Sequence, residues 1–225
     1  QPDTIEGSST QLNTESAPLA EKVIYEFPRR PKKGDVEMPP VKFTWYDGGL
    51  MPERPEGIPE GKTMGDNGGG AMFVGSKGTL ICSTYALDPY IIGREEDPPE
   101  VSKKFRRIPD AMNGGHEMDW VDACKEGDPD RPSSNFEYAG PLNEVVVMGN
   151  LAVRLQDLKR PLQWDGKNME ITNIDEDDEI RVVTSDSFKV VDGDPRFDTS
   201  YETTNAKEAA ERYIKRPYRD GWSYE

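Results

Sequence analysis

The sequence predicts an α+β domain, and two patterns along the chain lead to this prediction. In the first half, apolar residues alternate with polar ones, as in Lys22–Phe27 and Val41–Tyr46, which is typical of half-buried β-strands. In the second half, apolar residues recur at helical spacing. Because strands come first and helices follow, rather than alternating with them, the order favours an α+β domain over a parallel β/α one.

Further strands are expected on either side of the second alternating segment. Ala71–Val74 and Thr79–Cys82 flank Gly75-Ser76-Lys77-Gly78, which is a hairpin signal because glycine adopts positive φ without strain. The segment 28–34 is expected to be a connection, since Pro28 and Pro31 forbid a continuous ladder. The remaining segments with strand character are 5–12, 162–164, 169–172 and 180–191.

Three helices are expected. The first covers His116–Lys125 and stops at Gly127. The second opens at Gly140-Pro141, with proline at the first helical position, and its mid-helix Gly149 predicts close packing against another backbone. The third begins after Asn205, a residue type that caps helix N-termini.

Composition indicates a folded, acidic protein of one domain spanning residues 1–225. Its charged share of 32% is high, yet four Trp, nine Tyr and seven Phe supply a core that disordered chains lack. The net charge of −15 disfavours binding to nucleic acid or to anionic membranes. The chain opens on Gln1 rather than Met, so we expect that a segment precedes it.

Several polar clusters are expected to be structural. Cys82 and Cys124 are interpreted as buried free thiols, and a single histidine, His116, excludes a His-rich metal site. The pair His116 and Asp119 could meet at i, i+3, but a solvent-exposed histidine at a helix N-terminus is the favoured interpretation. The acidic run 175–179 lacks the spacing of a calcium loop and is interpreted as a solvated turn.

No segment resembles a phosphate-binding loop. Gly65–Gly70 has the glycines, but a loop rather than a strand precedes it, and it carries an acidic residue where a phosphate site needs unopposed N–H groups. We interpret it as a flexible loop. The sequence therefore predicts no cofactor-binding residues, and no independent NAD-binding domain in this chain.

The most suggestive cluster is Trp45-Tyr46-Asp47-Gly48-Gly49, an aromatic strand end that runs into a glycine-permitted turn. Aromatic faces stack on the C–H faces of sugar rings, and carboxylates bind their hydroxyls. Trp45, Asp47, Gly48 and Gly49 are therefore predicted to bind a substrate, while a core tryptophan followed by an ordinary turn is the alternative. No catalytic residue and no metal ligand are assigned.

Seven segments, in this order along the chain, resemble the C-terminal region of the glucose–fructose oxidoreductase and inositol dehydrogenase family, in its bacterial subgroup of secreted oxidoreductases. They cover nearly the whole chain: Val41–Gly49, Met72–Leu80, Asp119–Gly127 with Asn135–Glu144, Met148–Ala152, Leu162–Asp165 and Tyr218–Trp222. The resemblance implies an open, mostly antiparallel sheet with helices packed on one face, and a bacterial protein that is either secreted or cytoplasmic.

The resemblance also implies a function. Enzymes of the family transfer hydride between NAD or NADP and a sugar or cyclitol, and this chain would be the substrate-recognition and oligomerisation domain, catalytically incomplete alone. The fingerprint for the dinucleotide and the family's lysine and histidine segments lie upstream, so the partner would be a missing N-terminal Rossmann domain. The family's open sheet face also implies a homo-oligomer, and Val23, Tyr25, Phe43 and Phe73 are expected to be exposed in the monomer.

Two other functions stay open at this point. A non-catalytic carbohydrate-binding module would use the surfaces of Trp45 and Trp164. A glycoside hydrolase would use paired carboxylates such as Asp47 and Glu144, although the sequence does not fix the separation that this chemistry needs.

Overall fold

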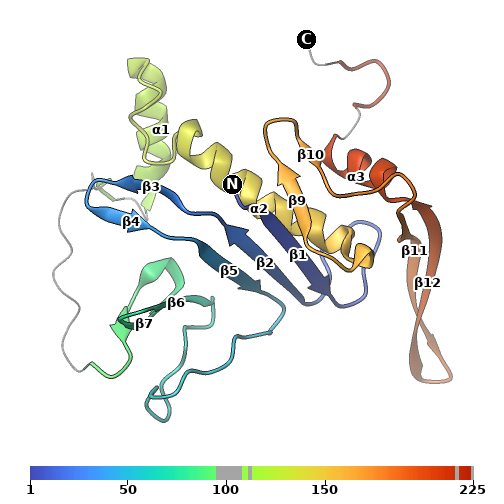
Figure 1. Ribbon diagram of the computed structural model, residues 1–225, viewed down its shortest axis with the longest axis horizontal. Coiled ribbons are helices and arrows are strands. Elements are labelled where there is room, and N and C mark those ends of the chain that lie inside the picture. Colours follow the sequence, from blue (N-terminus) through green and yellow to red (C-terminus); the bar gives the residue numbers. More distant parts are fainter. Residues whose placement is uncertain (95–107, 111–112, 216–217, 224–225) are drawn as a thin grey trace. The chain divides into compact units, whose positions relative to one another are not determined.

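The computed structural model describes residues 1–94, 108–110, 113–215 and 218–223 (Figure 1). These residues form three α-helices and twelve strands in antiparallel sheets, which confirms the α+β class. The chain divides into two compact units. Residues 1–51 and 134–225 form the first, and residues 52–133 form the second.

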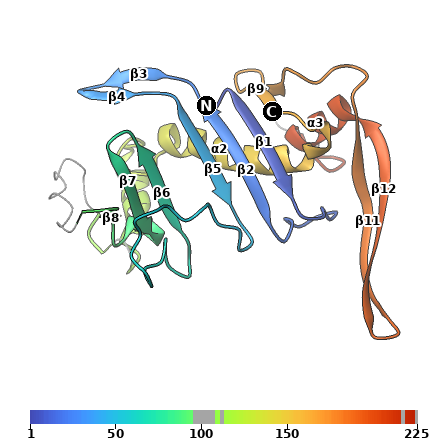
Figure 2. The same cartoon turned by 60° about the horizontal axis from the view of Figure 1, so that its bottom comes forward.

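The first unit contains a five-stranded sheet in the order β10-β9-β1-β2-β5. Its strands are β1 (Thr4–Ser9), β2 (Glu21–Phe27), β5 (Val41–Tyr46), β9 (Leu162–Asp165) and β10 (Glu170–Ile171). Helix α2 (Phe136–Arg154) lies across one face of this sheet, and β5 forms one edge (Figure 2).

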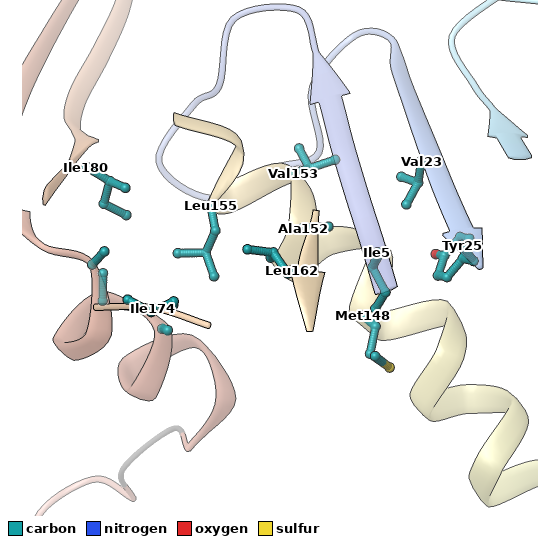
Figure 3. Close-up of a cluster of buried hydrophobic side chains, with 13 residues drawn as sticks. Ile5, Val23, Tyr25, Met148, Ala152, Val153, Leu155, Leu162, Ile174 and Ile180 are labelled. Carbon is teal, nitrogen blue, oxygen red and sulfur yellow. The ribbon is translucent and has the colours of Figure 1, made fainter. Parts of the chain in front are cut away.

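The core of the first unit lies between the sheet and α2. Ile5, Val23 and Tyr25 point from β1 and β2 toward Met148 and Ala152 of the helix (Figure 3). The other members are Val153, Leu155, Leu162, Ile174, Ile180, Ala206, Ala209 and Ala210. Val23 and Tyr25 are thus buried, against the expectation that a monomer exposes them, because α2 occupies the face to which they point.

The closest approach of helix and sheet occurs at Gly7. A Cβ at this position would lie 2.6 Å from the backbone C of Ala152 and from the backbone N of Val153, so α2 rests directly on β1. At Gly149 an added Cβ would meet the Tyr25 hydroxyl at 2.5 Å, which is a side chain. The close backbone contact expected at Gly149 is therefore found at Gly7, on the strand.

The opposite face of the sheet is polar. Lys42 Nζ lies 3.8 Å from Glu26 Oε1, and Lys22 Nζ lies 5.7 Å from the centre of the Tyr46 ring. Glu6 is exposed on the same face. Cross-strand pairs of this kind keep a sheet face hydrated, and Ile24 and the Tyr46 ring are its apolar members.

Side-chain caps fix the starts of α2 and α3. The side chain of Asn135 accepts a hydrogen bond from Tyr138 N at 3.1 Å, so α2 begins at Phe136, and Pro141 lies within the helix rather than at its first position. Asn205 caps α3 (Ala206–Ile214) as expected, accepting from the N–H groups of Lys207 and Glu208. A 3-10 helix, Gln156–Leu158, follows α2.

Two hairpins in the first unit differ from expectation. β3 (Arg30–Lys33) pairs with β4 (Val36–Met38), although 28–34 was expected to be an irregular connection. A two-stranded hairpin leaves each strand one free edge, and a proline such as Pro31 is tolerated there. The second hairpin joins β11 (Glu179–Val191) to β12 (Asp194–Asn205) through Asp192-Gly193, both at positive φ.

The described residues of the second unit form a three-stranded sheet in the order β6-β7-β8 and one α-helix. Its elements are β6 (Gly70–Gly75), β7 (Gly78–Ser83), the 3-10 turn Thr84–Ala86, β8 (Tyr90–Ile91) and α1 (Gly115–Glu126). The expected hairpin and helix are both confirmed. Cys82 is a buried free thiol, but Cys124 is exposed, because it points away from the buried side of α1 that holds Ala123.

Candidate functional site

Trp45 lies on the edge strand of the first unit's sheet. It pairs with Val23 across β2 and β5, so both side chains belong to the face that α2 covers. The side chain of Trp45 nevertheless stays 49% exposed. It is therefore not a core residue of the kind that the alternative interpretation required, and part of its ring is open to a ligand.

The turn after β5 needs both of its glycines. Leu50 N donates to Asp47 O at 3.3 Å and closes the turn around Gly48 and Gly49, whose φ angles are +66° and +87°. A Cβ at Gly48 would lie 1.9 Å from Leu19 O, so the backbone there passes directly against its neighbour. Gly48 and Gly49 thus shape the site, and no side-chain donor or acceptor comes from them.

Glu21 joins Asp47 at this end of the sheet. Asp47 N donates to Glu21 O at 2.9 Å, which places the two residues opposite each other at the ends of β5 and β2. Asp47 is exposed, and its Oδ1 also accepts from Gly48 N. Glu21 Oε2 is buried without a hydrogen-bond partner among the described residues. Burial, and secondly the charge of Asp47, raise the pKa of the Glu21 carboxyl above its ordinary value.

The same cluster affects Tyr25. Burial, and secondly the negative charge of Glu21, raise the pKa of Tyr25 to about 12.

Sequence reasoning identified Asp47 and Trp45 but missed Glu21. A signal was present, because Glu21, Val23 and Tyr25 alternate on one face of β2, and a glutamate on an apolar strand face is uncommon.

Replacing Glu21 with glutamine is expected to stabilise the protein at neutral pH. A carboxyl whose pKa is raised in the folded state costs stability once it ionises, so the wild type loses stability as the pH rises through the unfolded and then the folded pKa. We expect Glu21→Gln to gain up to about 1 kcal/mol at pH 7, or roughly 2–4 °C in Tm, allowing for partial solvent screening.

The measurement is Tm as a function of pH for both proteins. The difference should vanish below about pH 4, where the unfolded glutamate is protonated. Glu6→Gln is the matched control, since Glu6 is exposed on the opposite sheet face, and it should leave Tm unchanged. A Glu21→Gln protein with a lower Tm at pH 7 would contradict this account.

The Gly65–Gly70 loop, in the second unit, is organised by Asp66. Its Oδ1 accepts from Gly68 N at 2.8 Å and from Thr84 Oγ1 at 2.6 Å, and its Oδ2 accepts from Thr84 N at 3.2 Å. These bonds lower the pKa of Asp66, and the bond from the Thr84 hydroxyl has the largest effect. Gly68 N therefore already has an anionic partner within the loop.

His116 and Asp119 take separate roles on α1. His116 is exposed, whereas Asp119 is only 5% exposed and lies 3.5 Å from Arg131 Nε. Arg131 also pairs with Asp122 and Glu126, and its hydrogen bond to Glu126 is the main cause that raises its pKa. This ion-pair cluster ties the segment after α1 to the helix.

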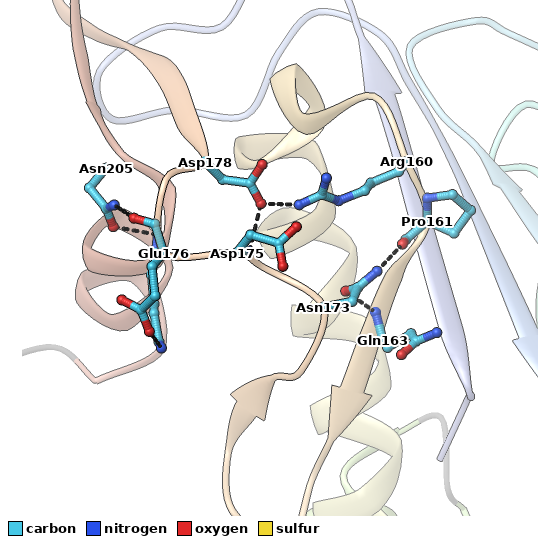
Figure 4. Close-up of polar contacts among 9 residues, drawn as sticks. Arg160, Pro161, Gln163, Asn173, Asp175, Glu176, Asp178 and Asn205 are labelled. Atoms are coloured by element: carbon cyan, nitrogen blue, oxygen red, sulfur yellow. Dashed lines mark hydrogen bonds and ion pairs between the residues drawn. The ribbon is translucent and has the colours of Figure 1, made fainter.

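Two residues of the acidic run 175–179 bond to residues outside the run (Figure 4). Asp178 accepts from Asp175 N at 2.7 Å and forms an ion pair with Arg160, while Glu176 pairs with Lys207 at the start of α3. Glu176 O also accepts from Asn205 Nδ2 at 2.7 Å. The run is mostly exposed, as a solvated turn is, and its contacts hold the N-terminus of α3.

Each of the two alternative functions used a second residue, Trp164 for the binding module and Glu144 for the hydrolase. These two side chains are hydrogen-bonded to each other. Trp164 Nε1 donates to Glu144 Oε1 at 2.8 Å, and its ring packs against the core cluster. Gln1 Nε2 lies 2.9 Å from both carboxylate oxygens of Glu144. Both side chains therefore have structural partners.

No family model matches the chain, and no curated protein does. Among the described residues, no group of three or more His, Cys, Asp or Glu side chains is arranged to hold a metal ion. None of the helices in the described part of the chain has the length and apolar character needed to cross a membrane.

Proposed function

We propose that this chain is the substrate-side domain of an NAD(P)-dependent oxidoreductase that acts on a sugar or cyclitol. The observation that carries the proposal is the half-exposed Trp45 ring beside Asp47 and Glu21, at one end of an antiparallel sheet whose other face is polar. A flat ring next to acceptor oxygens suits a polyol, which offers a C–H face for stacking and hydroxyls that donate.

The fold class and the seven resembling segments, six of which lie outside the site, also support the proposal. A sheet with a helix on one face agrees with the domain that the resemblance implies. Hydride chemistry belongs to the nicotinamide, so the role of this chain would be to bind and orient the substrate. The cofactor would be held by a separate Rossmann domain.

The two alternatives receive less support. A carbohydrate-binding module would share the Trp45 surface, but Trp164 is half-buried and donates to Glu144. A hydrolase that pairs Asp47 with Glu144 would need a carboxyl free to exchange protons, and Glu144 accepts from Trp164 and Gln1.

A binding experiment tests the proposal. We expect the chain to bind neutral polyols such as myo-inositol or glucose with Kd on the order of 1 mM, because about twelve heavy atoms contribute roughly 0.3 kcal/mol each. Ligand-observed NMR measures such affinities. Calorimetry with NADH and NADPH should give no binding in the micromolar range, since no strand–glycine loop–helix element occurs among the described residues.

The outcomes separate the parts of the proposal. Micromolar binding of a dinucleotide would contradict the missing cofactor domain. Absence of saturable binding for every neutral polyol would contradict the role of Trp45 and Asp47. Catalysis of glycoside hydrolysis by the chain alone would favour the third alternative.

A further inference from the structure

The hairpin of β11 and β12 is a long ribbon with an exposed apolar pair on one face. The segment before β2 contacts the next pair on this face, where Gln11 donates to Thr199 and Thr14 to Asp186, and it leaves the apolar pair exposed. Phe188 and Phe197 pair across the ribbon with ring centres 5.5 Å apart, and their side chains remain 59% and 68% exposed. Val190 and Pro195 form the next pair on the same face. An isolated two-stranded ribbon is marginal in water, and a third strand or a packed face stabilises it.

The other face of the ribbon is charged. Lys189 pairs in register with Arg196, and Lys189 Nζ lies 2.9 Å from Asp198 Oδ2. Arg196 has no ion-pair partner among the described residues. It is therefore an unpaired cation on a protein of net charge −15, next to the exposed aromatic pair on one strand.

The free edge of β12 presents backbone groups at Phe197. In a two-residue hairpin the residues that flank the turn, here Val191 and Asp194, form a hydrogen-bonded pair, and hydrogen-bonded and non-hydrogen-bonded pairs then alternate. The N–H and C=O of Phe197 consequently point outward, as do those of Thr199. Pro195 occupies an outward position too, where its missing N–H costs the ribbon no ladder bond.

We propose that two copies of this chain associate through this edge, with β12 of one copy antiparallel to β12 of the other about a two-fold axis at Phe197. In this register Phe197 faces its own counterpart and exchanges both backbone hydrogen bonds with it. Thr199 N–H of each copy reaches the carbonyl of Pro195 in the other. The result is a four-stranded sheet whose apolar face carries four phenylalanines.

Charge complementarity selects a second copy as the partner and fixes the register. Residues 196 and 198 stand opposite each other in this pairing, so Arg196 of each copy meets Asp198 of the other, twice per dimer. An isologous contact of this kind closes on itself and does not propagate into a fibre. The inference does not depend on the oxidoreductase proposal, because it uses none of the residues at Trp45.

Sedimentation of the full chain tests the proposal. We expect a concentration-dependent dimer with Kd on the order of 10 µM, since the edges bury less than the ~1,200 Å² of a standard interface. Arg196→Asp and Asp198→Arg should each weaken the dimer at least about 10-fold, because each places like charges opposite each other. An equimolar mixture of the two variants should dimerise again, since the opposed charges then differ in sign.

The proposed strand pairing also defines a control variant and the results that would contradict the dimer. Lys42→Ala removes a charge on β5, in another sheet of the first unit, and should leave the dimer intact. Circular dichroism and Tm show whether each variant folds. A wild-type chain that stays monomeric at about 1 mM overturns the proposal, and so does a dimer that either charge reversal leaves unchanged or that the mixture fails to restore.

Discussion

Replacing Gly7 with alanine is expected to lower the free energy of unfolding by about 2–3 kcal/mol, the range of an overpacked core. The added Cβ would lie 2.6 Å from two backbone atoms of α2, at Ala152 and Val153. A helix backbone cannot relieve such a clash by changing rotamer, as a flexible side chain can. The helix must therefore move away from β1, and the contact of α2 with Ile5 and Val23 is loosened with it.

Chemical denaturation of the single variant measures this loss. Asn143→Ala is the control, because Asn143 is exposed in the same helix α2. The control should be neutral or stabilising by up to about 0.7 kcal/mol, the helix preference of alanine over asparagine. Equal midpoints for Gly7→Ala and the wild type would show that α2 does not rest on β1 as described.

The sequence predicted those elements whose local signals agree with their packing. The strand Val41–Tyr46 and the cap at Asn205 were found with correct bounds, because alternation and capping are local properties. The start of α2 was misplaced. Pro141 looked like a first helical residue, whereas Asn135 supplies the cap that starts the helix one turn earlier.

Tertiary contacts explain what the sequence could not predict. The polar strand β12 has weak strand character of its own, and it exists because β11 pairs with it through the Asp192-Gly193 turn. The residues of the candidate site also come together through tertiary contacts. Trp45 and Asp47 were found on one strand, but Glu21 joins them only through the pairing of β2 with β5. The partner of Asp119, Arg131, was likewise missed because it follows α1 in a segment without helical pattern.

Replacing Trp45 with alanine is expected to weaken polyol binding by about 10-fold or more, which corresponds to about 1.4 kcal/mol, and to lower kcat/KM by a similar factor in a complete enzyme. The stacking surface is lost, while Asp47 and its turn remain. Because half of the Trp45 side chain is exposed, the loss of stability should be about 1–2 kcal/mol rather than the ~3–5 kcal/mol of a buried tryptophan.

Two companion variants separate binding from folding. Phe43→Ala is the matched control, since Phe43 lies on the same face of β5, is exposed to a similar degree at 42%, and stacks on Tyr25 with ring centres 5.4 Å apart. It should cost similar stability and leave polyol affinity intact. Trp45→Phe keeps a ring at the site and should retain most of the affinity. If Trp45→Ala and Phe43→Ala lose affinity equally, the effect comes from the strand as a whole, and Trp45 has no particular contact with the ligand.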